Sequence, residues 1–274
     1  MLPADLHTHT EFSWDTATGD MEGSCARAVE LGLPAIAFTE HTDFVSWTVD
    51  PAVLPERLTK HLADETRLVP PPLDVAGYLA AIERCRDKYP SLKIISGVEL
   101  GEPHWFAAET AALLAAAPFE RVIGSLHSLT VAGHYRLVED EYLLRPVPEV
   151  LRDYFAETIR LIETCPSFQA LTHLDYPLRY TPAGYAFDAA DFEEELRAVL
   201  RSLAGTGRAL EVNTRRTVEP LLLRWWREEG GRAVSFGSDA HRPDLVAAGF
   251  ADAAALAESV GFGPGRHPWD HWLA

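Results

Sequence analysis

Short apolar segments with the character of buried strands occur seven times along the chain, and stretches with helical spacing of apolar residues separate them. The strand-like segments cover residues 4–7, 35–39, 94–99, 122–125, 170–173, 209–213 and 233–237. The helical patterns include residues 21–31, 75–89, 148–164, 189–204 and 220–229. Strands that alternate with helices form a parallel sheet, because each helix returns the chain to the same end of the sheet. Seven such units predict a closed or nearly closed α/β barrel.

The length of 274 residues suits one barrel domain spanning residues 1–274, and an apolar content of 47% is ample for its core. The formal net charge of −17 argues against a nucleic-acid partner, because a phosphate backbone demands a basic surface. Three cysteines without a C-x-x-C pair predict buried free thiols rather than a disulfide framework. The sequence shows no leader and no membrane-spanning stretch, so we expect a soluble, cytoplasmic protein without a membrane partner.

Two connections between predicted elements are unusually long. They run from about 44 to 74 and from about 128 to 146, and both follow predicted strands. They therefore emerge at the C-terminal face of a barrel, where barrel active sites lie. We interpret them as candidate walls or lids for a substrate, and the alternative is that they pack only against the barrel exterior.

Histidines and carboxylates collect at the ends of the predicted strands. The residues in this position are His7, His9, His41, Glu99, His127, His173, Asp239 and His241. Alternate side chains of a strand point the same way, so His7 and His9 can reach one metal ion. A His-x-His pair is weak evidence alone, but the recurrence of such residues at one level of a barrel predicts a metal site.

The number and type of these residues restrict the metal chemistry. One ion uses three or four protein ligands, so eight candidates predict two to three ions, with Glu99 or Asp239 able to bridge. Nitrogen and oxygen ligands without thiolate suit Zn, Mn or Fe and do not choose among them. Multinuclear sites favour phosphoryl chemistry, because the ions can activate water and stabilise phosphate oxygens.

Five segments carry a resemblance to a known family. They are DLHTHT at 5–10, FTEHTDF at 38–44, GVE at 97–99, GSLH at 124–127 and GSDAH at 237–241. Together they resemble the polymerase and histidinol phosphatase (PHP) superfamily over essentially the whole chain. TEHTDF at 39–44 and THLDYPLRY at 172–180 look most like the stand-alone histidinol-phosphate phosphatases of that superfamily.

The resemblance implies a distorted (β/α)7 TIM-like barrel with a trinuclear metal site. The eight strand-end residues fall on the ligand positions of the family, and a ninth position falls on Asp15, where some relatives have histidine. The implied reaction is hydrolysis of L-histidinol phosphate to L-histidinol and phosphate, a step of histidine biosynthesis, by metal-activated water. Two alternatives stay open: a PHP phosphatase or phosphodiesterase acting on nucleotides or other small phosphate esters, and a non-catalytic metal-binding module.

Three further residues are candidates for contact with a substrate. Asp43 lies near the predicted site in sequence and could transfer a proton to the leaving group. Arg179 follows the fifth strand and could bind the substrate phosphate through its planar guanidinium; the alternative is a surface ion pair with Asp175 or Asp188. Arg215 could touch substrate, although we favour an exposed position for it. The native metal, the exact substrate and the oligomeric state stay open.

Overall fold

The computed structural model describes residues 2–52, 54–216 and 218–274. Its central sheet contains the seven predicted strands, and neighbouring members pair in parallel. In spatial order they are β1 (Asp5–Thr8), β2 (Ala35–Asp43), β5 (Lys93–Gly101), β6 (Arg121–Ser125), β9 (Ala170–Leu171), β10 (Ala209–Asn213) and β11 (Ala233–Gly237). The order of these strands in the sheet is their order in the chain, as in a barrel.

The sheet curls until its first and seventh strands meet. The amide of Asp239 donates to the carbonyl of His7 at 2.8 Å, and the amide of His9 donates to the carbonyl of Ala240 at 2.8 Å. A short strand that the sequence did not predict, β12 (Trp272–Leu273), pairs antiparallel with the beginning of β11. The predicted distorted TIM-like barrel is therefore confirmed.

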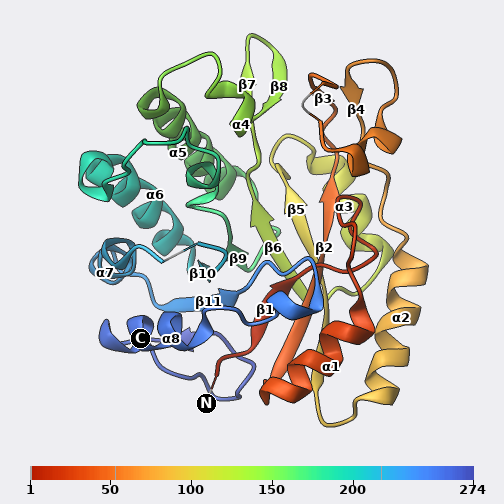
Figure 1. The fold of residues 1–274 in the computed structure, drawn as a ribbon. Helices are drawn as coiled ribbons and strands as arrows, with labels where there is room; N and C mark the ends of the chain where they lie inside the picture. The colour runs from red at the N-terminus through yellow and green to blue at the C-terminus, as the bar shows by residue number, and fades with distance from the viewer. Residues whose placement is uncertain (1, 53, 217) are drawn as a thin grey trace.

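Helices cover the outer face of the sheet (Figure 1). The α-helices next to the barrel are α1 (Met21–Leu31), α2 (Val75–Lys88), α3 (Ala107–Ala116), α5 (Val147–Thr164), α6 (Glu193–Thr206), α7 (Pro220–Glu228) and α8 (Phe250–Ser259). Helix α1 begins where the Asp20 side chain accepts from the amide of Gly23, and it ends at Gly32, whose φ of 69° suits glycine. The apolar faces of these helices pack against the strands and form the core.

The two long connections fold into small units of their own. The first contains β3 (Trp47–Thr48), the 3-10 helix η1 (Glu56–His61) and β4 (Arg67–Leu68). The second contains β7 (Ser128–Val131), β8 (His134–Leu137) and the short helix α4 (Val138–Glu141). Trp47 on β3 donates from Nε1 to Oγ of Ser128 at 2.7 Å, which joins the two units. Figure 1 shows both hairpins beyond the C-terminal ends of β2, β5 and β6.

Three short 3-10 helices complete the described elements: η2 (Tyr176–Arg179), η3 (Ala189–Phe192) and η4 (Pro243–Leu245). The predicted helix at 189–204 is therefore η3 followed by α6. All three cysteines are buried and free, as predicted. In the described ranges, no helix has both the length and the apolar character needed to cross a membrane.

Candidate metal centre

The eight strand-end residues predicted from the sequence converge at the C-terminal end of the barrel. Their side chains form overlapping groups whose nitrogen and oxygen atoms lie within 4.8 Å of one another. The groups are His9 with His41 and His241, His7 with His9 and Asp239, His7 with Glu99 and His173, and His41 with Glu99 and His127. Because the groups share members, the cluster has room for more than one ion.

Glu99 lies at the middle of this cluster and is fully buried. Its Oε2 atom lies 3.1 Å from Nε2 of His7, 3.2 Å from Nε2 of His9 and 3.3 Å from Nδ1 of His41. Glu99 lies on β5, which pairs with β2 on one side and β6 on the other, and the ends of those two strands also carry or precede ligand candidates. A carboxylate in this position can bridge cations.

The other oxygen of Glu99 shows that these contacts are not an ordinary hydrogen-bond network. Oε1 lies 2.9 Å from Nε2 of His173 and 3.3 Å from Nε2 of His127. Yet within the described residues neither pair has the alignment of a hydrogen bond, and Nδ1 of His41 is likewise unpartnered. Buried polar atoms rarely stay unpartnered. Nitrogen and oxygen atoms that lie close together without hydrogen-bond alignment are better suited to coordinating a shared cation than to bonding with each other.

The charges of the clustered residues depend on one another. Burial opposes ionisation of Glu99, but His41, His173 and His7 hold the pKa of its carboxyl well below the ordinary range. Burial lowers the pKa of His173 to about 3, so this imidazole is neutral. Ionised carboxylates and neutral imidazoles are the forms that bind metal ions. For His7, burial is outweighed by Glu211, Glu99 and Asp239, which raise its pKa well above the ordinary value. His7 would therefore have to release a proton when it binds a metal ion.

The far nitrogens of the first two histidines are held by groups that the sequence analysis missed. Nδ1 of His7 lies 2.7 Å from Oε1 of Glu211, and Nδ1 of His9 lies 3.0 Å from Oγ of Ser13. Ser13 in turn donates to Oε2 of Glu40 at 2.6 Å. Such partners fix the ring orientation and tautomer of metal-binding histidines. A signal for Glu211 was available, because it is a carboxylate inside the predicted strand at 209–213, and a buried carboxylate needs a partner.

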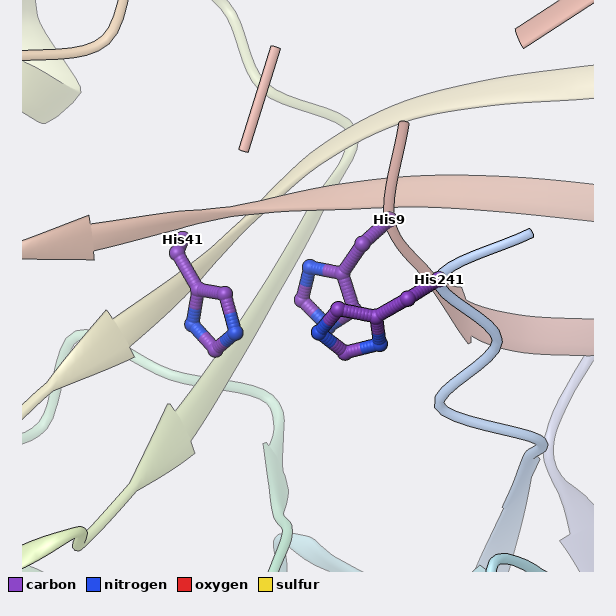
Figure 2. A group of neighbouring side chains, drawn as sticks. All are labelled: His9, His41 and His241. Carbon is purple, nitrogen blue, oxygen red and sulfur yellow. The ribbon is translucent and has the colours of Figure 1, made fainter. Parts of the chain in front are cut away.

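The loop after β1 brings Asp15 to the cluster. Its Oδ2 atom lies 3.1 Å from Nε2 of His241 and 3.7 Å from Nε2 of His41. Figure 2 shows the rings of His9, His41 and His241 gathered together from three separate segments. Burial opposes ionisation of Asp15, but His41 and His241 lower its pKa far enough to keep the carboxylate charged. Asp15 belongs to none of the groups whose atoms converge within 4.8 Å, so its role as an oxygen ligand stays a prediction.

Two of the clustered residues have a strained backbone. His173 has a φ of 64° and Asp239 a φ of 54°, in the left-handed region that side chains other than glycine seldom adopt. Each follows a strand, β9 or β11, at the point where the chain turns away. Backbone strain of this kind persists where the surrounding structure enforces it, which is common at functional sites.

Asp43 lies beside the cluster rather than in its middle. Its Oδ2 atom accepts from Nε1 of Trp14 at 2.8 Å, and its Oδ1 atom lies 3.6 Å from Nδ1 of His127. Glu102, which the sequence analysis did not select, shares a group with these two residues, and its Oε1 accepts from the amides of His127 and Ser128. Burial raises the pKa of Glu102 to about 7, although the charge of His127 lowers it.

A cavity of about 510 Å³ opens next to the cluster. Cationic, carboxylate, aromatic and aliphatic side chains line it, including residues of both long connections, such as Trp47, Leu58 and Leu137. Arg179 and Arg215 also line it. The cavity thus combines the cluster of candidate metal ligands with positive charge and an apolar wall, which suits a small anionic ligand with an organic body.

Arg179 does not form the surface ion pair with Asp175 or Asp188 that was the alternative to phosphate binding. Its side chain is only 10% exposed, and it donates to Oδ2 of Asp239 at 2.7 Å and to Nδ1 of His173 at 3.2 Å. Arg215 is 44% exposed, in keeping with the position we favoured, yet it lines the cavity and donates to the carbonyl of Asp239 at 3.0 Å.

Comparisons with known proteins agree with this geometry. Histidinol-phosphatase from Lactococcus lactis is 29% identical over 251 residues, covering 88% of this chain and 85% of its own. A Deinococcus radiodurans protein named "Probable histidinol-phosphatase" is 29% identical and covers 94% and 93%. Among solved structures, histidinol phosphate phosphatase from L. lactis, in complex with Zn, L-histidinol and phosphate, matches with a TM-score of 0.79 and 25% identity over 98% of both chains.

The model of the PHP domain family matches residues 5–215, which is more than half of the chain. This range contains the strands β1 to β10 and six of the eight clustered residues, and the match follows the resemblance seen in the sequence. The chain belongs to the PHP domain family.

Proposed function

We propose that this chain is a metal-dependent phosphatase that hydrolyses L-histidinol phosphate to L-histidinol and phosphate. The observation that carries the proposal is the buried cluster around Glu99, which opens on a cavity lined by Arg179 and Arg215. The relative from L. lactis, whose structure contains Zn, L-histidinol and phosphate, supports the choice of substrate because the likeness covers nearly the whole of both chains.

The nine residues predicted from the sequence would hold two to three divalent transition-metal ions. They are His7, His9, Asp15, His41, Glu99, His127, His173, Asp239 and His241. When bound, such ions supply Lewis-acid stabilisation and activate water for attack on phosphorus. Zinc is the ion in the L. lactis structure, and the ligand set of this chain also suits manganese or iron.

The protein's own residues would bind and orient the ester. Arg179 lines the cavity, and its buried Nε–H has no hydrogen-bond partner within the described residues. A planar, permanently charged guanidinium suits phosphate oxygens. Trp14 and Trp47, whose ring centroids lie 5.8 Å apart, line the cavity and would exclude water from the organic part of the substrate.

Hydrolysis forms a bond from the water oxygen to phosphorus and breaks the bond from phosphorus to the ester oxygen. The leaving alkoxide must gain a proton. Asp43 lines the cavity beside His127 and is our candidate for that transfer. Glu211 and Ser13 would keep His7 and His9 in the orientation that the cluster requires.

A panel of phosphate esters tests the proposal. L-histidinol phosphate, nucleoside monophosphates and p-nitrophenyl phosphate are compared by phosphate release with the zinc- and manganese-loaded protein. We expect kcat/KM for L-histidinol phosphate to exceed the others by at least about tenfold, which is about 1.4 kcal/mol of transition-state stabilisation. A nucleotide that outperforms it would favour the alternative phosphoesterase, and no turnover of any ester would favour the non-catalytic module.

A further inference from the structure

Four carboxylates line the cavity within the described residues: Asp15, Asp43, Glu139 and Asp239. Three of them face cationic groups or imidazoles. Asp15 lies beside His241, Asp43 beside His127, and Asp239 is bonded to Arg179. These three carboxylates are therefore already engaged by the metal cluster and its surroundings.

Glu139 differs from the other three, because no ion pair or hydrogen bond to its carboxylate occurs among the described residues. Its Oε2 atom is buried and unpartnered. An unpartnered buried carboxylate oxygen is costly to keep. Burial raises the pKa of Glu139 to about 7. A cationic ligand in the cavity would supply the missing partner and offset that cost.

The position of Glu139 is fixed from two sides. The amide of Val138 donates to the carbonyl of His127 at 3.1 Å, so Glu139 follows directly after a residue tied to the metal cluster. Further along, the hydroxyl of Tyr142 donates to the carbonyl of Pro177 at 3.0 Å. This bond ties the segment after α4 to η2, the element that carries Tyr176 and Arg179.

Tyr176 lies near Arg179 and is affected by the charge of Glu139. The guanidinium carbon of Arg179 lies 5.3 Å from the centroid of the Tyr176 ring. Burial raises the pKa of the Tyr176 hydroxyl, the charge of Glu139 raises it further, and Arg179 lowers it. The charges of Glu139 and Arg179 therefore both act on the hydroxyl of Tyr176. A short ligand with an anionic and a cationic end can meet both.

We infer that Glu139 binds the ammonium group of the substrate while Arg179 and the metal cluster bind its phosphate. The inference rests on the proposed function, since L-histidinol phosphate carries its amino group on the carbon next to the phosphate-bearing one. Glu139 would thus determine specificity for amino-substituted phosphate esters. It would not take part in the reaction at phosphorus.

Two substrates and three variants test this inference. The substrates are L-histidinol phosphate and its desamino analogue, 3-(imidazol-4-yl)propyl phosphate. Glu139→Gln keeps the size of the side chain and removes its charge, and Glu139→Asp keeps the charge. Asp140→Asn is the matched control, because it removes a neighbouring negative charge on α4 from a residue that does not line the cavity. The measured quantity is the ratio of kcat/KM for the amino ester to kcat/KM for the desamino ester.

We expect Glu139→Gln to lower this ratio at least about tenfold, as the loss of a charged hydrogen bond predicts. Glu139→Asp should retain more of the ratio than Glu139→Gln, and Asp140→Asn should stay within about twofold of the unmodified protein. Calorimetry with L-histidinol alone gives a second readout, in which Glu139→Gln should weaken binding by a similar factor. An unchanged ratio with unchanged L-histidinol binding would overturn the role of Glu139. Failure of the unmodified protein to hydrolyse L-histidinol phosphate would instead refute the proposed function.

Discussion

Arg179 donates a hydrogen bond to the Oδ2 atom of Asp239 at 2.7 Å, so the arginine expected at the substrate phosphate is bonded to a proposed metal ligand. Burial disfavours the charge on both side chains, but each holds the other ionised, and the pKa of Asp239 lies well below its ordinary value. A substitution of Arg179 can therefore change both phosphate binding and the charge balance of the cluster. Kinetic data on such variants need metal analysis beside them.

Replacement of Arg179 by alanine should lower kcat/KM by about 30- to 1000-fold, on the scale of about 2–4 kcal/mol for a charged donor lost from a water-excluded site. Arg179→Lys should also lose activity, because an ammonium group lacks the planar fork. The control is Arg201→Ala, which removes an exposed ion pair with Glu229 and should change little. Steady-state kinetics within twofold of the unmodified protein would show that Arg179 does not bind phosphate.

The purified protein should contain two to three equivalents of divalent transition metal, because the clustered ligands exceed what one ion can use. Elemental analysis after gentle purification measures the content. Chelation should remove activity and lower the melting temperature, since an ion that binds only the folded state stabilises it. A content below one equivalent after reconstitution contradicts the multinuclear site.

The Glu99→Gln variant should lose metal and most activity while the barrel stays folded. An amide is a neutral and weaker ligand, and it cannot bridge two cations as a carboxylate can. Circular dichroism checks the fold, and elemental analysis checks the metal. Glu83→Gln, at an exposed residue of α2, serves as the control for a lost negative charge. Normal turnover at normal metal content would show that Glu99 is not a ligand.

Glu211→Gln should weaken metal binding by roughly 10- to 100-fold without removing any proposed ligand. The reason is that Glu211 orients His7 through a 2.7 Å contact with Nδ1. Titration of the metal-free variant with zinc measures the effect. If affinity is unchanged, the orientation of His7 does not depend on Glu211.

Asp43→Asn should slow hydrolysis of L-histidinol phosphate more than that of p-nitrophenyl phosphate. An alkoxide needs a proton to leave, whereas p-nitrophenolate is a stable leaving group. The ratio of the two kcat/KM losses is the measurement. Equal losses would instead assign Asp43 a positioning role through its contacts with Trp14 and His127.

Much of this architecture follows from local sequence patterns. The strands were predictable because β2, β5 and β6 each contain a short apolar or β-branched run, as buried parallel strands do. The ligand candidates were predictable from their place at strand ends, where the barrel brings them to one face. Asp15 required the family resemblance, because nothing local distinguishes it from a turn residue.

The contacts that organise the site were harder to predict, because they join residues distant in the chain. Glu211 meets His7 across 204 residues. Arg179 pairs with Asp239 rather than with Asp175 or Asp188, since η2 turns its side chain inward over the cluster. Only three-dimensional packing decides which charged neighbour a residue meets. The pair β11 and β12 was missed for the same reason, because two residues are too short for a strand pattern.

The closure of the barrel at His7 and Asp239 sets the moment at which the metal centre can first exist during synthesis of the chain. Asp15 and its neighbour His241 are 226 residues apart, so a nascent chain makes the first part of the site long before the last part. The early strands carry only part of the proposed ligand set, so they cannot enclose a complete cluster. Binding of the full set of ions is therefore expected late in folding, after β11 has paired with β1.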